Sequence, residues 1–569
     1  MNQEQFFAEI VEIIKKEKLD KNKLSRLKIK LCKKYKLKKV PTDIEILLNA
    51  PEKDIEKIKK VLLTKPVRTI SGVAVVAIMT KPYPCPHAKT IGPCIYCPGG
   101  PKSYFGTVPQ SYTGKEPATR RAIRNKYDPY LQVMNRLEQY IVLGHVPDKI
   151  ELIIMGGTFP SFPKSYQKYF ITYSFKAMND FSSFFFKKEF DFFEFKDFFE
   201  LPGDIENKER TERIQKKLLR LKTKTKLEKE QILNENSKIK CVGLTIETRP
   251  DFAKLKEANF MLELGCTRVE LGVQTVYDDV LKKILRGHTV QDSIESTQIL
   301  KDLGFKINYH IMPGLPSVSF KQDLFAFKEL FYNPYFRPDM LKIYPCMVLK
   351  GTKLYSLWKK KKYKPLTTKE AADLIIKFKK YVPEYCRIMR VQRDIPTFVT
   401  EAGVDRTNLR QYVNEIMKKR KIKCRCIRCR EPKLRKINLK NTEIIIRGYQ
   451  ASNGIDFFIS LEDVKNDILV GFCRLRFPYK FLRKEINSES ALIRELHVYG
   501  TATAIGQKEH LQHKGIGKVL LEEAEDICKK YYKNKIVVIS GVGVRNYYRN
   551  LGYKREGPYM VKYLNTKII

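Results

Sequence analysis

The chain has 569 residues, of which 43% are hydrophobic, and it carries a formal net charge of +46. This length suits three or four domains with their own cores, and no apolar run approaches the roughly 18 residues that a membrane helix needs. The positive charge favours a polyanionic partner such as nucleic acid, although a composition rich in lysine throughout is the plain alternative.

Residues 1–70 are predicted to form a basic helical region. Phe6, Ile10, Ile13 and Ile14 recur at helical spacing on one face, and lysines are frequent elsewhere. This charge is suited to binding a nucleic acid, while helix faces that are merely solvated are the alternative.

Cysteine usage indicates the compartment. The N-terminus has no apolar signal core, and the cysteines number thirteen, which is odd. We therefore expect a reducing cytoplasm, in which cysteines are thiols or metal ligands rather than disulfides.

Residues 71–385 are predicted to form a parallel sheet curved into a full or partial barrel of six β/α repeats. Helix-like segments separate several short β-rich runs: "GVAVVAIMT", "KIELIIMGG", "CVGLTIET", "TRVELGVQT", "KINYHIMPG" and "MLKIYPC". In such folds the chemistry lies at the C-terminal ends of the strands.

Three cysteines follow the first of these strands in "CPHAKTIGPCIYCPGGP". Cys85, Cys94 and Cys97 could bind zinc with His87 as fourth ligand, or three corners of a [4Fe–4S] cluster. The residues alone leave both open. Their position after the first strand, with Tyr96 before the last cysteine, favours the cluster.

A basic strip lies in "TRRAIRNKYDPY". It comprises Arg120, Arg121, Arg124 and Lys126, interleaved with tyrosine. The charges suit phosphates and the rings could stack on unpaired bases, so we expect RNA contact here. Structural ion pairs are an equally good interpretation of any one of these residues.

The sequence "MGGT" follows the second predicted strand. Its glycines, Gly156 and Gly157, allow the backbone to approach a bound ligand closely, although most double glycines mark plain turns. Further on, residues 180–237 combine a phenylalanine-rich stretch with a charged helical one. We interpret them as an insertion or a partly disordered segment, with an apolar docking face as the alternative.

Residues 386–440 form a basic connector that contains "CRCIRCR". The close spacing of Cys424, Cys426 and Cys429 predicts a structural zinc site. Its fourth ligand is not evident, and Cys386 and Cys346 are candidates.

Residues 441–569 are predicted to form a strand-rich domain with one long helix. "QHKGIG", Gln512–Gly517, fits the Q-x-x-G-x-G pattern of acetyl-CoA-binding N-acetyltransferases (GNAT), in which Gly515 and Gly517 lie at a helix N-terminus. The exposed N–H groups and the helix dipole suit a pyrophosphate. The pattern is weak alone, but a strand precedes it and a helix follows.

Several long runs, in order, resemble the catalytic subunit 3 family of the Elongator complex, a branch of the radical S-adenosylmethionine enzymes. These runs are "TKPYPCPHAKTIGPCIYCPGGP", "QSYTGKEPATRRAIRNKYDPYLQ", "MGGTFPSFP", "LTIETRPDF", "VELGVQTVYDDVLKKILRGHT", "YHIMPGLP", "IRELHVYGTA", "QHKGIG" and "ISGVGVRNYYRNLGY". The resemblance covers about residues 70–569 apart from the phenylalanine-rich segment. It implies a radical-enzyme partial (β/α)6 barrel followed by a GNAT domain.

The resemblance also implies cofactors and ligands. Cys85, Cys94 and Cys97 would bind a [4Fe–4S] cluster, whose open iron binds S-adenosylmethionine. Gly156, Gly157 and Gln274 would line the adenosylmethionine pocket. The acetyl-CoA site and its nearby catalytic residues would comprise Lys149, Glu495, Leu496, His497, Val498, Gln512, Gly515, Ile516, Gly517, Lys518, Tyr547 and Tyr548. Core packing is the alternative for the two tyrosines, and a solvated turn is the alternative for Lys149.

The family's reaction would convert uridine 34, the wobble base in the anticodon loop of tRNA, to 5-carboxymethyluridine. A deoxyadenosyl radical would take hydrogen from the acetyl methyl of acetyl-CoA, and the carbon radical would add to C5. Oxidation and thioester hydrolysis would complete the product. An electron donor is required, and the chain could act alone, as a homodimer or with accessory Elongator-type subunits.

Two other functions remain open from the residues. The C-terminal domain could act as a protein lysine acetyltransferase, with Glu495 as general base and the cluster purely structural. Alternatively, the chain could be a non-catalytic RNA-binding scaffold. The complete cysteine triad and acetyl-CoA loop speak against a scaffold.

Overall fold

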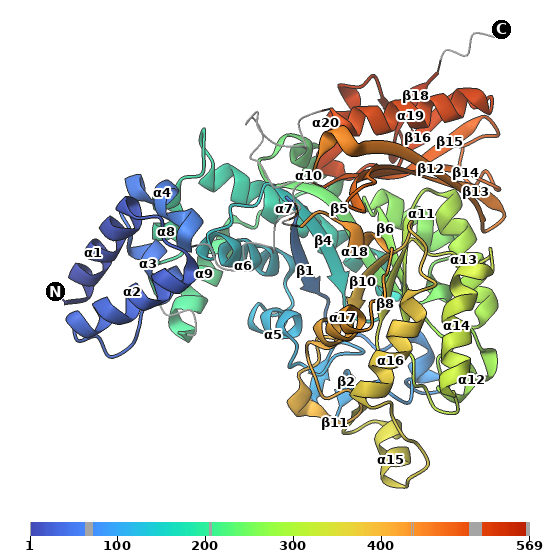
Figure 1. The fold of residues 1–569 in the computed structure, drawn as a ribbon, viewed down its shortest axis with the longest axis horizontal. Coiled ribbons are helices and arrows are strands. Elements are labelled where there is room, and N and C mark those ends of the chain that lie inside the picture. The colour runs from blue at the N-terminus through green and yellow to red at the C-terminus, as the bar shows by residue number, and fades with distance from the viewer. Residues whose placement is uncertain are drawn as a thin grey trace.

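The computed structural model describes residues 2–62, 72–203, 207–433, 435, 437–499 and 515–564. Figure 1 shows a small helical domain, a curled sheet wrapped by helices and a second sheet domain, in chain order. This is the predicted fold class. Within the described ranges, no helix combines the length and apolar character needed to cross a bilayer.

The described N-terminal helices are α1 (Asn2–Lys16), α2 (Lys21–Lys34), α3 (Asp43–Asn49) and α4 (Glu52–Leu62). Phe6, Ile10 and Ile14 are buried, and Ile13 packs against the same core, so the predicted apolar face is confirmed. Thr42 begins α3 with a reciprocal capping box.

The central domain is a curled sheet in which every neighbouring pair of strands is parallel. Its order is β1-β4-β5-β6-β7-β8-β10. The strands are β1 (Ala74–Met79), β4 (Lys149–Met155), β5 (Lys240–Thr248), β6 (Arg268–Gln274), β7 (Lys306–Ile311), β8 (Met340–Ile343) and β10 (Arg387–Val391). The predicted partial barrel is confirmed.

Helices cover the outside of this barrel and its strand ends. They are α5 (Pro117–Arg124), α6 (Pro129–Val142), α7 (Lys164–Phe185), α11 (Leu255–Glu263), α12 (Asp278–Lys283), α13 (Val290–Asp302), α14 (Phe320–Tyr332), α15 (Lys353–Lys359) and α16 (Thr368–Lys379). Two short antiparallel pairs, β2 (Gly100–Ser103) with β3 (Gly106–Val108) and β9 (Val348–Leu349) with β11 (Thr400–Ala402), complete it.

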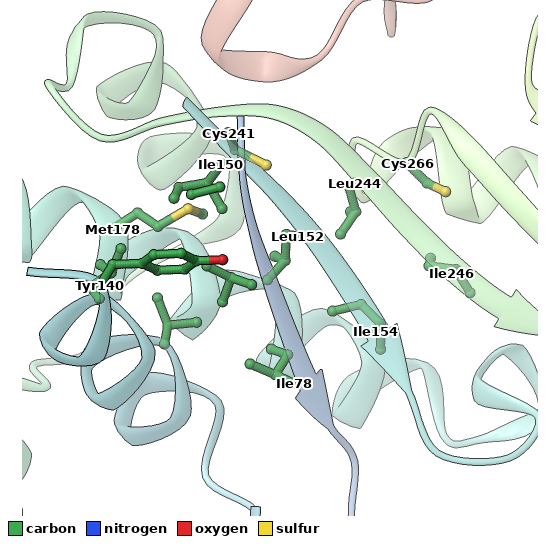
Figure 2. Close-up of a cluster of buried hydrophobic side chains, with 14 of the residues drawn as sticks. Ile78, Tyr140, Ile150, Leu152, Ile154, Met178, Cys241, Leu244, Ile246 and Cys266 are labelled. Carbon is green, nitrogen blue, oxygen red and sulfur yellow. The ribbon is translucent and has the colours of Figure 1, made fainter. Parts of the chain in front are cut away.

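The side chains of β4 point alternately to the helices outside the barrel and to the cavity inside it. Ile150, Leu152 and Ile154 are fully buried against side chains of α6 and α7 (Figure 2). The intervening Ile153 and Met155 face the inside of the barrel, where they line a cavity. Because successive strand residues point to opposite faces, one strand supplies both layers.

The phenylalanine-rich segment is folded where the structure describes it, so partial disorder was the wrong interpretation of those residues. It continues α7 into α8 (Phe192–Phe198), α9 (Lys208–Leu221) and α10 (Leu227–Asn236). Phe181, Phe185, Phe195 and Phe199 are essentially fully buried against one another. Their rings form a local core rather than a docking face.

The predicted connector contributes strand β10, which pairs with β8 and which the sequence reading missed. It continues through β11 into α17 (Leu409–Lys419) and the single turn α18 (Ile427–Arg430). Ile388 and Val391 of β10 are buried, whereas Arg390 is directed into the cavity. Because Arg387 and Arg390 interrupt the apolar residues of β10, the sequence pattern did not indicate a strand in this basic segment.

The C-terminal domain is a mixed sheet of order β12-β13-β14-β15-β16-β18-β17. Only β15 and β16 run parallel. The elements are β12 (Thr442–Ala451), β13 (Gly454–Asp463), β14 (Ile468–Phe477), β15 (Ser490–Val498), α19 (Ile516–Lys530), β16 (Lys535–Val538), α20 (Arg545–Arg549), β17 (Lys554–Glu556) and β18 (Tyr559–Tyr563). Helix α19 packs on β13, β14 and β15.

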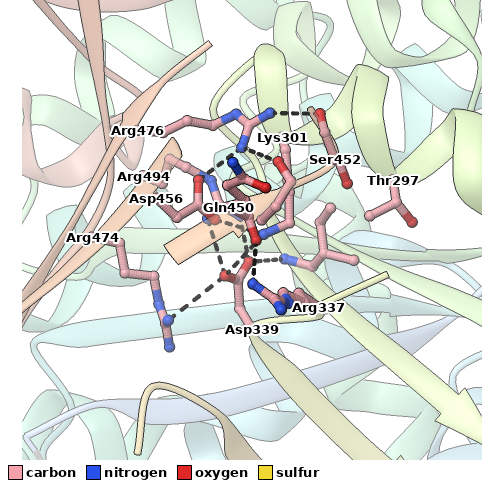
Figure 3. Close-up of polar contacts among 12 residues, drawn as sticks. Thr297, Lys301, Arg337, Asp339, Gln450, Ser452, Asp456, Arg474, Arg476 and Arg494 are labelled. Atoms are coloured by element: carbon pink, nitrogen blue, oxygen red, sulfur yellow. Dashed lines mark hydrogen bonds and ion pairs between the residues drawn. The ribbon is translucent and has the colours of Figure 1, made fainter. Parts of the chain in front are cut away.

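A buried ion network joins the two sheet domains (Figure 3). Lys301 of α13 pairs with Asp456 of β13 at 2.6 Å, and Asp339, just before β8, pairs with Arg494 of β15 at 2.5 Å. Figure 1 shows the C-terminal domain at the end of the barrel where the strands begin, with β2, β11 and α5 at the opposite end.

Candidate functional site

A cavity of about 580 Å³ occupies the inside of the barrel. Residues from each of the barrel strands contribute to its wall, and Cys85, which follows β1, lies in it. The cavity therefore lies where the predicted chemistry was expected.

Three cysteines gather at this cavity, and buried polar groups face their sulfurs. Gln110 Nε2 lies 3.4 Å from Cys97 Sγ, and Arg286 Nη1 lies 3.7 Å from Cys94 Sγ. Burial, followed by the charges of Cys97 and Cys94, raises the pKa of the Cys85 thiol to about 12. A group bound through these sulfurs as thiolates must therefore bring positive charge.

The spacing of the sulfurs distinguishes a cluster from a single zinc ion. Zn–S bonds of about 2.3 Å place the sulfurs of a tetrahedral site roughly 3.8 Å apart. Among the described residues, Cys85, Cys94 and Cys97 do not all lie within 4.8 Å of one another, whereas Cys424, Cys426 and Cys429 do. The first trio is therefore not arranged around one tetrahedral ion in this structure, whereas three thiols can hold three corners of a [4Fe–4S] cluster.

His87, the alternative zinc ligand, is held by other partners. Its Nε2 lies 3.4 Å from Cys94 Sγ, and its Nδ1 contacts Arg249. Burial and the charges of Arg249 and Arg286 lower the pKa of His87 to about 3, so the ring is neutral. A neutral ring can donate one hydrogen bond to a sulfur ligand.

Gly156 and Gly157 end β4 in left-handed conformations, with φ of 119° and 84°. A Cβ on Gly156 would lie 2.3 Å from Thr80 Oγ1, so only glycine fits. Gln274 ends β6, also at positive φ (71°), and within the described structure its buried Oε1 accepts no hydrogen bond. All these strand ends surround the cavity, and Gln274 offers it a free acceptor.

A polar group deeper in the cavity was missed by sequence reasoning. Glu247, Glu270 and His310 place ligand atoms within 4.8 Å of one another, and Lys342 bonds both carboxylates. Burial alone would raise the pKa of Glu270, but Lys342 and His310 hold it well below its usual value. Because Lys342 and Arg268 already pair with these two carboxylates, the group is an ion-paired floor rather than a cation site.

Only alternation within each predicted strand could have indicated this floor. Glu270, His310 and Lys342 lie on neighbouring strands at positions that face inward. Each is flanked on its strand by residues that point the other way, and this alternation is the usual signature of a barrel interior.

The predicted RNA strip does not form one surface. Arg121 lines the cavity, and Arg120 lines a separate surface hollow beside it. Arg124 is exposed on the side that faces α9, and Lys126 is exposed beyond the helix. Two of the four residues thus lie at the cavity's mouth.

The predicted acetyl-CoA residues surround a gap in the C-terminal sheet. Among the described strands, β16 pairs with β15 only up to Ile493, and the strand that pairs with Glu495, Leu496, His497 and Val498 is β14. Gly515 starts α19 in a left-handed conformation, and Ile516, Gly517 and Lys518 form its first turn. Gln512 lies outside the described residues.

Tyr547 closes one side of this gap. Its hydroxyl oxygen would lie 2.8 Å from a Cβ on Gly517. Tyr547 is 41% exposed, whereas Tyr548 is 6% exposed and packs in the domain core at 5.3 Å from the Tyr547 ring. Tyr547 is therefore the more accessible of the two.

Lys149 begins β4, at the end of the barrel opposite the cysteines. It is in register with Lys240 of β5, against which the loop residue Gly543 of the C-terminal domain packs. The structure thus places Lys149 at the barrel edge that faces the acetyl-CoA domain.

Glu495 is not free to act as a general base. Arg474 Nε donates to it at 2.8 Å. Burial alone would raise its pKa, but the charges of Arg474 and Lys306 outweigh burial and lower it. A carboxylate held in this way is a weak proton acceptor, which counts against a lysine acetyltransferase built on Glu495.

The second cysteine trio is compact and lies between the two sheet domains. Cys424 and Cys426 precede α18, Cys429 lies within it, and Lys379 Nζ lies 3.6 Å from Cys429 Sγ. Neither Cys386 nor Cys346 belongs to this group, although the backbone oxygen of Cys386 accepts a hydrogen bond from Ile427.

Comparison with known proteins gives matches along nearly the whole chain. Residues 3–70 match the ELP3 N-terminal domain, 85–326 the Radical SAM superfamily, 338–419 the Radical_SAM C-terminal domain and 430–553 the Acetyltransferase (GNAT) family.

Similar curated proteins cover almost all of it. A "tRNA uridine(34) acetyltransferase" of Methanocaldococcus infernus is 46% identical, with 98% of each chain covered. Elongator complex protein 3 of Schizosaccharomyces pombe is 43% identical, covering 98% of this chain and 97% of its own. A solved structure, the archaeal Methanocaldococcus infernus Elp3 with N-terminus deletion (1-46), is 42% identical with a TM-score of 0.70, covering 87% of this chain and 100% of that chain.

Proposed function

This chain belongs to the family of Elongator complex protein 3, and on that premise we propose that it converts uridine 34 of tRNA to 5-carboxymethyluridine. It is an enzyme with a radical SAM domain and an acetyltransferase domain. Relatives bearing the name tRNA uridine(34) acetyltransferase support the base and its position.

Cys85, Cys94 and Cys97 would bind a [4Fe–4S] cluster, because they are not arranged around one tetrahedral ion and three thiols can hold three of its corners. When bound, the cluster and S-adenosylmethionine supply radical chemistry that activates the acetyl methyl group for bonding to C5 of uracil. Gln110 and Arg286 would donate hydrogen bonds to the cysteine sulfurs and hold the group in place.

The cavity walls would bind adenosylmethionine and the target base. Gly156 and Gly157 let the backbone approach the cofactor, and the free Oε1 of Gln274 accepts one of its N–H or O–H groups. Lys342 at the floor bonds Glu247 and Glu270 with two of its three N–H groups, so the third would donate to a uracil carbonyl. An anticodon base can enter because it is unpaired in its loop.

The C-terminal domain would deliver acetyl-CoA. The backbone of β15 from Glu495 to Val498, which lies beyond the pairing with β16, would bind the pantetheine amides, and the first turn of α19 would bind the phosphates. Tyr547 and Lys149 would lie beside the thioester and its path to the barrel.

We also propose a structural zinc ion at Cys424, Cys426 and Cys429. Three thiols within 4.8 Å of one another have the spacing that a tetrahedral ion requires. The proposal also includes the domain ranges 1–70, 71–385, 386–440 and 441–569, except that β10 (Arg387–Val391) extends the barrel domain past residue 385. It further includes an electron donor, assembly as a homodimer or with accessory subunits, and a cytoplasmic location.

One observation carries the reaction. A barrel cavity lined by Cys85 of the first cysteine trio, and a sheet gap suited to acetyl-CoA, occur in two domains of one chain that a buried interface joins. The test incubates anaerobically reduced protein with tRNA, acetyl-CoA and adenosylmethionine, followed by nucleoside analysis. We expect both 5-carboxymethyluridine and 5′-deoxyadenosine.

Cys94→Ser should abolish both products, whereas Cys32→Ser, a buried cysteine of α2 far from the cavity in sequence and fold, should retain them. Carboxymethyluridine formation by Cys94→Ser would refute the radical assignment. Acetylated protein formed without adenosylmethionine would favour a lysine acetyltransferase. Tight tRNA binding with neither cofactor consumed would favour a scaffold.

A further inference from the structure

A hollow in the surface lies beside the mouth of the catalytic cavity. This outer bay, of about 610 Å³, is lined by Lys115, Arg120, Arg393, Pro396 and Phe398 among others. It shares Pro117, Arg393, Asp394 and Ile395 with the cavity wall. A strand of nucleotides with one base in the cavity would therefore pass directly over the bay.

Phe398 is an exposed ring on an anchored turn. It lies in a 3-10 turn, Thr397–Val399, and 80% of it is exposed. Its neighbours are fixed, because Ile395 is buried and Val399 packs with it against Met347 and Leu349. The following strand, β11, pairs with β9. A large apolar ring held rigidly in water is typical of a binding surface.

The charges around the ring are available for a polyanion. Lys115 and Arg120 are exposed, and neither forms an ion pair with any residue in the described ranges. The bay's one acidic residue, Asp394, is paired with Arg390. Unpaired cations beside an exposed aromatic ring are the combination that binds single-stranded nucleic acid, by phosphate contact and base stacking.

We propose that the outer bay binds the nucleotide adjacent to the target uridine, with its base stacked on Phe398 and its phosphate near Lys115 and Arg120. This rests on the proposed function, because it needs a target base in the cavity. Turning one base inward removes the stacking partner of its neighbour in the loop. The Phe398 ring replaces that partner and stabilises the opened loop.

The test measures binding of an anticodon stem-loop RNA to the full chain by fluorescence anisotropy at fixed salt. Phe398→Ala should weaken binding about 5- to 100-fold, the range for loss of one stacked base. Phe398→Trp should retain wild-type affinity. The control, Phe325→Ala, removes a ring that is 55% exposed on the barrel helix α14, and should change affinity less than twofold.

A second measurement identifies the stacked base. Abasic substitution at each loop position of the RNA should reveal one position, next to uridine 34, that weakens wild-type binding as much as Phe398→Ala does. The Phe398→Ala variant should be insensitive to that same substitution. Because the Phe398 side chain is exposed, its replacement by alanine or tryptophan should leave the fold unchanged.

Unchanged RNA affinity in Phe398→Ala would overturn the proposal, as would additive losses for every abasic position. An occupant other than RNA, such as an acidic peptide, would give this same unchanged affinity. The affinity measurements with Phe398→Ala and the abasic RNAs need no turnover, so they can support the proposal even if no carboxymethyluridine is formed. Failure of the reaction and failure of the bay are thus separate results.

Discussion

At the scale of one residue, Lys379 indicates the charge that the compact cysteine trio, Cys424, Cys426 and Cys429, would carry. Its side chain is almost completely buried (1% exposed), and its Nζ lies 3.6 Å from Cys429 Sγ. A buried ammonium needs negative partners, and hydrogen bonding among the three thiols, together with burial, leaves only the pKa of Cys426 lowered in this trio. If the proposed zinc ion binds, three thiolates around one dication would carry a net charge of about −1, which Lys379 would balance.

Removing one sulfur of this trio should remove the metal. We expect Cys426→Ser to lose most of its bound zinc and at least about 2 kcal/mol of unfolding free energy, because the metal stabilises only the folded chain. Zinc content by mass spectrometry and urea unfolding measure these effects. Cys386→Ser should keep its zinc, since Cys386 lies outside the trio. Zinc lost from Cys386→Ser but not from Cys426→Ser would reverse the ligand assignment.

The sequence predicted ligands more readily than their supporting residues. Cys85, Cys94 and Cys97 stand in one short motif, so spacing alone drew attention to them. Arg286 lies 192 positions from its sulfur partner Cys94, and the fold alone brings the two together. Such long-range partners need a strand register that the sequence does not specify.

At the scale of elements, α8 shows a helical pattern concealed by composition. Phe192, Phe195 and Phe199 have spacings of three and four residues and lie on the buried side, whereas Glu194 and Lys196 lie on the other. The helical period was present, but the density of phenylalanine and charge suggested a low-complexity segment. Strand β10 was concealed for the converse reason, because its arginines interrupt a short apolar run.

Truncation of the α8 core should show that this segment contributes to stability. Phe195 is fully buried, with rings of Phe185 and Phe199 at 5.6 and 4.9 Å. Phe195→Ala should lower the unfolding free energy by about 3–5 kcal/mol. The neighbouring Phe193, 71% exposed, is the control, and Phe193→Ala should stay within about 0.5 kcal/mol. Equal effects of the two variants in urea unfolding would refute the assigned core.

At the scale of the whole molecule, buried charge fixes the acetyl-CoA domain on the barrel. Besides the two pairs already described, Arg476 of β14 bonds Asp302 of α13 at 2.6 Å, and both side chains are fully buried. Each pair joins the two domains, so neither surface could be exposed without leaving unpaired charges. We therefore expect the barrel and the C-terminal domain to move as one unit.

This network should give the molecule a specific acid sensitivity through Asp339. Burial alone would raise the pKa of Asp339, but the charges of Arg494, Lys301 and Arg474 lower it from 3.8 to about 2. The folded protein therefore binds this proton less readily than the unfolded chain. The stabilisation is complete above about pH 4 and is lost as the pH falls towards 2, a change of about 2 kcal/mol.

Asp339→Asn tests that origin, because it removes the titrating group and leaves Arg494 with only Asp456. We expect a loss of about 3–5 kcal/mol at pH 7, and a gap to wild type that narrows by about 2 kcal/mol as the pH falls from 4 towards 2. Urea unfolding across pH measures both. Asp526→Asn, which changes a carboxylate in an exposed pair with Lys529, should follow the wild-type curve. If the difference in unfolding free energy between Asp339→Asn and wild type stayed constant with pH, the acid sensitivity would arise elsewhere. Loss of a titrating group must change the slope of unfolding free energy against pH, and not only its value at one pH.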